Sequence, residues 1–113
     1  MAGKFEIKLT ADGRHFFNLK AGNGQIILTS EIYESKPACL NGIESVKKNA
    51  SIAERFERRT SDAGDPYFIL KAGNHLEIGR SETYQGGVNA MENGINSVMS
   101  NAPEAEINDT TSA

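Results

Sequence analysis

The sequence predicts an α+β fold built from two tandem β-β-β-α repeats, since the chain reads nearly the same way twice. Residues 20–33 (KAGNGQIILTSEIY) resemble residues 71–84 (KAGNHLEIGRSETY) at an offset of 51 positions, 71 minus 20. Residues 41–50 (NGIESVKKNA) resemble residues 93–102 (NGINSVMSNA) at an offset of 52, so the second copy carries one extra residue before this stretch. A copy of about fifty residues is too short to bury an ample core alone. We therefore expect the two copies to fold as one cooperative unit.

Each copy opens with three predicted strands. In the first, Phe5, Ile7 and Leu9 alternate with charged residues, which is the two-residue period of a half-buried strand. Glycine-containing turns at residues 12–13 and 21–24 then separate two further apolar stretches. Two short turns in succession predict an antiparallel meander, whose apolar face we expect to pack on the helices.

The first strand of the second copy is poorer in apolar residues than its counterpart. Arg58 and Thr60 stand where the first copy has Ile7 and Leu9. Because its inward positions lack apolar bulk, we expect this strand to lie at an edge of the sheet or to be shorter.

Each copy closes with a predicted helix, because apolar residues recur at i, i+4, i+7 and i+11. These residues are Cys39, Ile43, Val46 and Ala50 in the first copy and Met91, Ile95, Val98 and Ala102 in the second. Ser35 and Pro37 suit the start of the first helix, whereas residues 86–87, both glycine, leave the start of the second helix open. Gly42 and Gly94 lie in mid-helix, which costs about 0.5–1 kcal/mol each. We therefore expect the helix backbone there to pack closely against the sheet or the partner helix.

The repeats span about residues 4–50 and 55–102, which predicts a single domain over residues 1–102. From Pro103 onward the sequence PEAEINDTTSA is acidic and polar, with one apolar residue. Such a composition predicts a disordered acidic tail over residues 103–113.

Composition argues against several classes of protein. Hydrophobic residues make up 38% and charged residues 24% of the chain, which is ordinary for a globular domain. No apolar run approaches the roughly 18 residues that span a bilayer, so we expect no membrane partner. The start MAGKFEIKL lacks an apolar export signal, and the lone Cys39 cannot form an internal disulfide, so we expect a cytoplasmic protein. The net charge of −3 gives no basic face, which argues against nucleic acid as a partner.

The KAGNG turn, the SExY stretch and the helical NGIxSVKxNA pattern occur in one order and resemble the YegP-like family of small uncharacterised bacterial proteins. The resemblance covers roughly residues 4–102 and includes the extra residue before the second NGI. It implies an α+β fold in which two β3-α repeats intertwine into one pseudo-twofold domain, so that the chain is a monomer with an internal pseudo-dimer. The family has no established activity, so the resemblance implies no catalytic, cofactor-binding or metal-binding residues.

The best candidate functional residues belong to the SExY stretch that precedes each helix. They are Ser30, Glu31 and Tyr33 in the first copy and Ser81, Glu82 and Tyr84 in the second. Two glutamates brought together by pseudo-symmetry could act as acid and base in a shared pocket. In the simpler interpretation, which we favour, the serine binds local backbone, the glutamate faces the positive end of the helix and the tyrosine packs its ring.

Other reactive side chains favour structural roles. His15 and His75 do not occupy equivalent positions, and a metal site would need three or four ligands. Cys39 aligns with Met91, which favours core packing over a nucleophile. The Lys-Ala-Gly-Asn turns lie between strands, unlike a phosphate-binding loop, so we expect hairpin turns and no cofactor.

The one concentration of basic residues in the sequence could bind single-stranded nucleic acid if aromatic side chains accompanied it. The basic residues are Arg55, Arg58, Arg59, Lys47 and Lys48, and the aromatics would be Phe16 and Tyr67 on the sheet face opposite the core. Neighbouring glutamates dilute this charge. We therefore rank a non-catalytic binding or interaction module of unknown partner first. An enzyme with acid–base chemistry at the Ser-Glu-x-Tyr site ranks second, and a weak nucleic-acid binder third.

Overall fold

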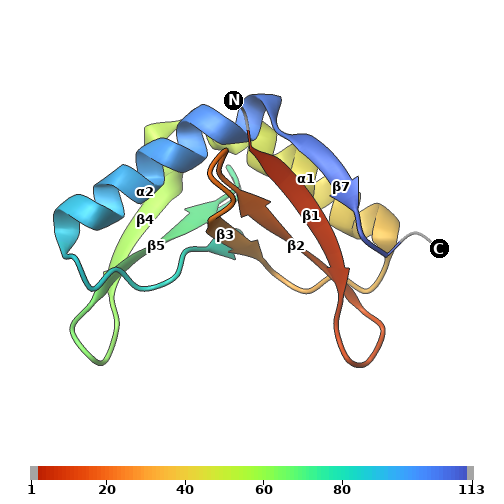
Figure 1. Cartoon of the computed structure of the whole chain (residues 1–113), viewed down its shortest axis with the longest axis horizontal. Coiled ribbons are helices and arrows are strands. Elements are labelled where there is room, and N and C mark those ends of the chain that lie inside the picture. Colours follow the sequence, from red (N-terminus) through yellow and green to blue (C-terminus); the bar gives the residue numbers. More distant parts are fainter. Residues whose placement is uncertain (1–2, 112–113) are drawn as a thin grey trace.

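The computed structural model describes residues 3–111, and this part of the chain contains seven strands and two α-helices. In chain order these are β1 (Lys4–Leu9), β2 (His15–Lys20), β3 (Ile26–Ser30), α1 (Lys36–Asn49), β4 (Phe56–Thr60), β5 (Pro66–Lys71), β6 (Glu77–Arg80), α2 (Val88–Asn101) and β7 (Glu106–Asp109), with short 3-10 turns η1 (Ala53–Arg55) and η2 (Ala102–Glu104). All seven strands join one sheet in the order β4-β5-β6-β3-β2-β1-β7. The sheet bends into an arch, and both helices lie along its convex side (Figure 1).

Each repeat forms an antiparallel meander. β1 pairs with β2 and β2 with β3, and β4, β5 and β6 pair in the same way. The two meanders meet where β3 pairs with β6, and Thr29 lies opposite Arg80 there. Because Arg80 is the counterpart of Thr29 at the offset of 51 (80 minus 29), this pair marks a pseudo-twofold axis. The α+β prediction of two intertwined β-β-β-α repeats is confirmed.

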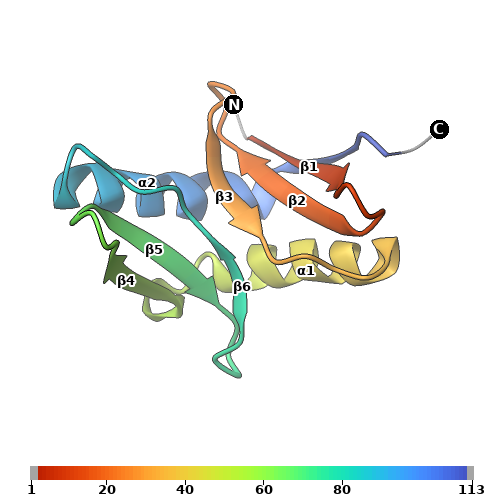
Figure 2. The same ribbon diagram turned by 90° about the horizontal axis from the view of Figure 1, so that it is seen from below.

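The core is shared between the repeats, because each helix packs on strands of both meanders. α1 contacts β2, β5 and β6, and α2 contacts β3 and β5. The largest fully buried side chains include Phe5, Phe17, Phe68, Ile43, Val46 and Val98. Figure 2 shows β3 and β6 running across the middle of the sheet in front of both helices. Neither repeat therefore covers its apolar face alone.

The first strand of the second repeat, β4, lies at one edge of the sheet, as the sequence predicts. It has five residues, whereas β1 has six. Arg58 occupies the position that Ile7 holds in β1 and forms an ion pair with Glu92 of α2, in which Arg58 Nη2 lies 2.9 Å from Glu92 Oε1. A charged residue at an inward position protects an edge strand from pairing with other chains.

The prediction of a disordered tail is wrong for residues 103–111. η2 begins this segment, and β7 then pairs in parallel with β1, with Ile107 opposite Phe5. The Thr110 N–H donates to Ile7 O at 3.2 Å, and Lys36 Nζ lies 2.6 Å from Asp109 Oδ2. Composition missed this strand because the edge of β1 binds it through backbone groups, which any sequence provides. Residues 112–113 of the predicted tail lie outside the described residues.

The two helices begin differently. Ser35 caps α1, and its Oγ accepts a hydrogen bond from the Ala38 N–H at 3.2 Å, which confirms the predicted cap. α2 begins at Val88 after Gly87, whose φ of 92° lies in the region that glycine adopts at little cost. The two glycines of the second copy thus replace a side-chain cap with a backbone turn.

Candidate functional site

Ser30 and Ser81 hold the corner where each third strand turns toward its helix. Ser30 Oγ accepts from the Phe17 N–H at 2.8 Å and donates to Glu31 O at 2.7 Å. Ser81 makes the same two bonds, to the Phe68 N–H at 3.0 Å and to Glu82 O at 2.8 Å. The hydroxyl replaces a backbone partner where the strand leaves its neighbour. These contacts support the structural interpretation of the serines.

The tyrosines of the SExY stretches explain the mid-helix glycines. The Tyr33 ring stacks on Phe17, with centroids 6.3 Å apart, and the Tyr84 ring stacks on Phe68 in the same way at 6.2 Å. A Cβ at Gly42 would lie 2.3 Å from the Tyr33 hydroxyl oxygen, and one at Gly94 would lie 2.2 Å from that of Tyr84. The expectation of a close approach is met, but the contact is a tyrosine and not the partner helix or the sheet backbone.

Two grooves lie at the two ends of the β3–β6 crossing, the place where β3 of the first repeat pairs with β6 of the second. Groove 1 lies between the β2–β3 turn (residues 20–27) and residues 82–97, and encloses ≈ 750 Å³. Groove 2 lies between residues 72–78 of the β5–β6 turn and residues 33–45, and encloses ≈ 340 Å³. One wall of each groove belongs to the first repeat and the other to the second. Intertwining of the repeats therefore creates both grooves.

The grooves are related by the pseudo-twofold axis, because equivalent residues line them. The shared lining consists of a turn asparagine, the SExY tyrosine and a helix face with alanine, asparagine, glycine and serine. In groove 1 these are Asn23, Tyr84, Ala90, Asn93, Gly94 and Ser97, and in groove 2 they are Asn74, Tyr33, Ala38, Asn41, Gly42 and Ser45. The duplicated motifs of the sequence thus converge on two copies of one surface.

Most of the duplicated polar residues have an internal partner. Asn23 Oδ1 accepts from the Gln25 N–H at 3.0 Å, and Asn74 Oδ1 accepts from the Leu76 N–H at 3.1 Å, which shapes the two turns. The groove serines accept from asparagines one helical turn further along. These residues need no ligand to explain them.

Asn41 and Asn93 are different. Both are exposed, and within residues 3–111 neither side chain forms a hydrogen bond with the protein. Each lies on the helix wall of its groove. In the sequence both belong to the helical NGI motif, and neither was predicted as a functional residue. The available signal was an identical polar residue at an outward helix position in both copies.

The grooves differ in how far they open. Beside groove 2, the Glu31 N–H donates to Ile78 O at 3.0 Å, which extends the pairing of β3 with β6. The symmetry-related bond beside groove 1, from Glu82 N–H to Ile27 O, is not formed in the described chain. Groove 1, where this bond is missing, is also the larger of the two grooves, ≈ 750 Å³ against ≈ 340 Å³.

The two candidate glutamates do not share a pocket. Glu82 borders groove 1, whereas Glu31 lies at the other end of the β3–β6 crossing, beside Ile78. A hydrogen bond with Glu77 raises the pKa of Glu31, and burial adds to that rise. Burial also raises the pKa of Glu77, but hydrogen bonds with Arg80 at 3.0 and 3.1 Å and with Glu31 outweigh it and lower this pKa overall. The main contact of Glu31 is therefore Glu77. It is neither Glu82, as the acid–base hypothesis requires, nor the start of the following helix, as the structural interpretation predicts.

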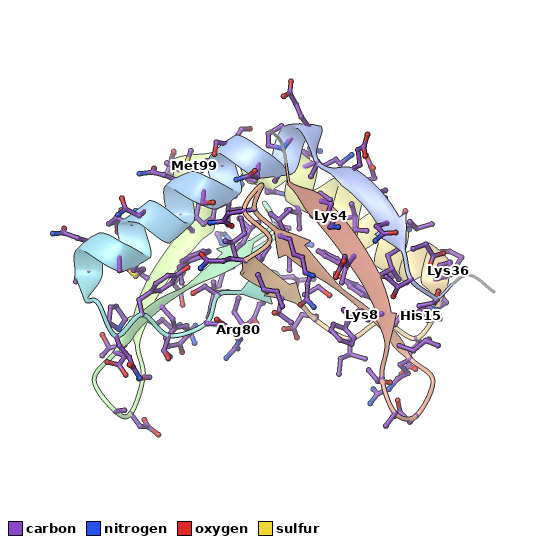
Figure 3. The ribbon with its side chains drawn as sticks, viewed as in Figure 1. Lys4, Lys8, His15, Lys36, Arg80 and Met99 are labelled. Atoms are coloured by element: carbon purple, nitrogen blue, oxygen red, sulfur yellow. The ribbon has the colours of Figure 1, made fainter. Side chains whose placement is uncertain are left out.

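The concave face of the sheet carries charged side chains that are mostly paired. Glu6, 8% exposed, lies 3.0 Å from Lys20 and 3.9 Å from both Lys4 and Lys8. Glu57, its counterpart in the second repeat, likewise forms ion pairs with Arg59 and Lys71. Figure 3 shows Lys4 and Lys8 spaced along β1, and Arg80 beneath the middle of the arch. Glutamates thus offset much of the positive charge on this face.

The remaining reactive side chains have structural surroundings. Cys39 is fully buried on α1, and burial raises the pKa of its thiol to about 11, which disfavours a thiolate. His15 pairs through its backbone with Tyr33, and His75 occupies a turn with φ of 69°. Among residues 3–111, no three His, Cys, Asp or Glu side chains are grouped to hold a metal ion. No helix in this range has the length and apolar character needed to cross a bilayer.

Fold and grooves together define a small pseudo-twofold α+β module with two related surface clefts. Comparison with family models places it further, because the model described as a domain of unknown function, DUF1508, matches residues 11–57 and again residues 61–109. The chain therefore belongs to this family and carries its domain twice in tandem. The second match extends through β7, in agreement with the structure of that segment.

Relatives and solved structures agree with this assignment. The chain is 55% identical to the UPF0339 protein MS1092 of Mannheimia succiniciproducens over 109 residues, which covers 96% of each chain. It is 47% identical to the UPF0339 protein YegP of Yersinia pestis over 109 residues, again 96% of each. The solution structure of yegP from E. coli, a protein of unknown function, is similar with a TM-score of 0.92 and 44% identity, covering 100% of this chain and 97% of that one. The resemblance to the YegP-like family is confirmed.

Proposed function

We propose that the protein is a non-catalytic binding module of the cytoplasm that holds its ligand in the two grooves. The observation that carries this proposal is the pair Asn41 and Asn93, exposed amides that the duplication has kept at one position and that bind no other side chain of the described protein. Exposed asparagines are common on protein surfaces, but this pair recurs at one position in both repeats, and each member lines a groove with its carboxamide left free by the described chain for a ligand.

The chemistry of the grooves supports binding more than catalysis. A carboxamide donates and accepts hydrogen bonds but does not titrate near neutral pH, so it cannot act as a general acid or base. The volume of groove 1, ≈ 750 Å³, lies within the range of about 300–1,000 Å³ that is usual for ligand sites. An acid–base reaction at the SExY stretch has less support, because Glu31 and Glu82 lie at opposite ends of the β3–β6 crossing.

The weak nucleic-acid alternative also has less support than the grooves. Phe16 and Tyr67 do lie on the sheet face opposite the core, and the Arg80 guanidinium is 6.0 Å from the Tyr67 ring. The positive charges of this face are nevertheless paired with glutamates, which weakens attraction to phosphates.

Chemical-shift mapping tests the proposal. The 15N-labelled protein is titrated with N-acetylglycine N-methylamide and, separately, with N-acetylglucosamine as polar probes. We expect shifts that cluster at the groove residues and that disappear in the double variant Asn41→Ala/Asn93→Ala. Asn96→Ala, an exposed asparagine of α2 outside the grooves, is the matched control and should leave the shifts intact. The proposal would be wrong if the probe-induced shift changes fell outside the groove residues. It would also be wrong if a hydrolase screen found turnover that Glu31→Gln abolished.

A further inference from the structure

The pairing of β3 with β6 ends unequally at its two ends. Thr29 lies opposite Arg80, and in the same register the Glu31 N–H donates to Ile78 O at 3.0 Å. The next hydrogen-bonded pair in the other direction would be Ile27 with Glu82, whose backbone bond is not formed in the described chain. β3 and the chain that follows β6 thus separate at groove 1, although the register of the β3–β6 pairing would allow one more hydrogen-bonded pair.

The chain after β6 follows β5, just as the chain after β3 follows β2, where the Tyr33 N–H donates to His15 O at 2.6 Å. The two connections are equivalent, and the backbone bond to the other repeat is what distinguishes the two ends. The Ser81 N–H donates to Phe68 O at 2.9 Å, and the Tyr84 N–H donates to Pro66 O at 2.8 Å. Figure 2 shows this connection leaving β3 and running along α2 to the start of that helix. Groove 1 therefore includes a wedge, the space between the start of β3 and residues 82–84, which diverge from each other.

Backbone along an open edge is suited to a third strand. N–H and C=O groups at such an edge require partners, which are either water or another extended chain. Ile26, at the start of β3, is 38% exposed, so a segment can approach this end of the strand, while the neighbouring Ile27 is buried in the core. Strand addition to an open edge is a common way in which domains bind peptides.

The opposite wall leaves room for a peptide and offers it a hydrogen-bonding group. Ala90, Asn93, Gly94 and Ser97 follow one another at i, i+3, i+4 and i+7, so α2 presents a face of short side chains to the groove. Among them, the Asn93 carboxamide can donate to a peptide C=O and accept from a peptide N–H. One exposed amide above an open strand edge matches the repeating polarity of a peptide backbone.

The charges at the groove favour a neutral or basic segment over an acidic one. Lys20 is held by Glu6 at 3.0 Å, whereas Glu82 is exposed and forms no ion pair within residues 3–111. A lysine or arginine of the bound segment would therefore meet an uncompensated carboxylate.

We propose that groove 1 binds an extended, neutral or basic segment of another polypeptide, which adds as a strand to the edge of β3 that residues 82–84 leave free and is held from the other side by Asn93. This inference rests on the proposed binding function and adds the class of ligand. Groove 2 does not take such a segment, because the Glu31–Ile78 bond closes its wedge and its volume is smaller, ≈ 340 Å³.

The test begins with a random-peptide library displayed on phage and selected on the full-length protein. A selected peptide is then synthesised and its affinity measured by fluorescence anisotropy. Asn93→Ala should weaken binding about tenfold, since a buried hydrogen-bonding partner is lost. Asn41→Ala, the equivalent change in groove 2, is the matched control and should leave the affinity unchanged. Glu82→Lys should weaken the binding of basic peptides.

A second measurement separates strand addition from binding through side chains. N-methylation of the peptide amides one at a time should abolish binding at alternate positions, because every second N–H of an added strand points to its partner. Loss at no position, or equal loss at all positions, would overturn the inference.

The two proposals fail in different ways. If the small polar probes shift the groove residues but no selected peptide binds there, strand addition is wrong and the binding function stands. If neither probe nor peptide perturbs the grooves, both proposals are wrong. Equal loss of peptide affinity in Asn41→Ala and Asn93→Ala would contradict the assignment to groove 1.

Discussion

β1 and β4 are equivalent strands of the two repeats, yet the chain protects their outer edges in different ways. β1 keeps Ile7 fully buried, and β7 pairs along its outer edge. β4 has Arg58 at the same position, paired with Glu92, and no strand covers its outer edge in the described chain. An open strand edge invites pairing with other chains unless it is covered or charged. The comparison shows that β1 is protected by a covering strand and β4 by a charged residue, although the two strands arose as copies of each other.

The grooves repeat this contrast in a functional setting. The residues that shape both corners, serine, tyrosine and mid-helix glycine, are the same in the two repeats. The residues at the groove mouths differ: groove 1 has Gln25 and Ile26, and groove 2 has Leu76 and Glu77 at the equivalent positions. Duplication has kept what builds a groove and changed what a ligand would meet.

The largest expected effect comes from a charge in the shared core. Val46→Asp or Val98→Asp would bury an unpaired carboxylate and should cost about 4 kcal/mol or more. Because both helices pack on both meanders, either change should collapse the 1H–15N spectrum of both repeats together. Lys48→Asp, on the exposed side of α1, is the control and should retain a folded spectrum. Collapse of one repeat alone would contradict the shared core.

Removal of residues 106–113 would uncover the edge of β1 and make it resemble β4 without the charge. The loss of the β7 ladder should lower the free energy of unfolding by about 3 kcal/mol, since several backbone hydrogen bonds disappear. Denaturant unfolding measures this loss, and sedimentation should show self-association through the open edge. A chain that ends after Thr111 should match the full-length protein. If the shorter truncation behaved like the longer one, β7 would not be the cause.

A change at the tyrosine corner should have a smaller effect. Gly94→Ala places a Cβ within 2.2 Å of the Tyr84 hydroxyl oxygen and should cost about 2 kcal/mol through overpacking. In a Tyr84→Ala background the same change should cost less, because the hydroxyl and the ring carbon next to it, which would lie 2.7 Å from the new Cβ, are both gone. Thermal unfolding of the four proteins in this cycle gives the coupling. Additive effects would show that the tyrosine does not explain the glycine.

The smallest effect concerns the ion pair that anchors β7 to α1. A hydrogen bond from Lys36, supported by Thr111, holds the pKa of Asp109 well below its usual range. A lowered pKa adds stability above the pKa of the unfolded chain, about 3.9, and this stability is lost as the pH falls through the folded pKa. Asp109→Asn should therefore lower the Tm modestly at pH 7, with the difference from wild type shrinking in acid. A difference that stayed constant into strong acid would rule out the ion pair as its source.

The sequence predicted the parts of the fold that local patterns determine. Alternation around Phe5 and Ile7 marked a strand, helical spacing marked both helices, and the loss of apolar residues at Arg58 placed β4 at an edge. β7 could not be predicted in this way, because its pairing depends on an unfilled edge about a hundred residues earlier in the chain.

The candidate site was predicted only in part, for a similar reason. Tyr33, Glu82 and Tyr84 of the SExY stretches border the grooves, whereas Ser30, Glu31 and Ser81 do not, and the contacts that matter join positions distant in sequence. Tyr33 packs against Gly42, and Glu31 contacts Glu77 only because β3 pairs with β6. Asn41 and Asn93 were visible as a repeated motif, yet their exposure required the three-dimensional structure.

The intertwining of the repeats is tested most directly by the 1H–15N spectrum of residues 1–52 alone, recorded at a concentration at which sedimentation shows a monomer. The fragment retains Phe5 and Ile7 but lacks the strands of the second repeat on which α1 packs. We predict a collapsed spectrum for the monomer, with dispersed signals appearing only if the fragment dimerises. A well-dispersed spectrum from a strict monomer would show that each repeat folds independently and would contradict the account.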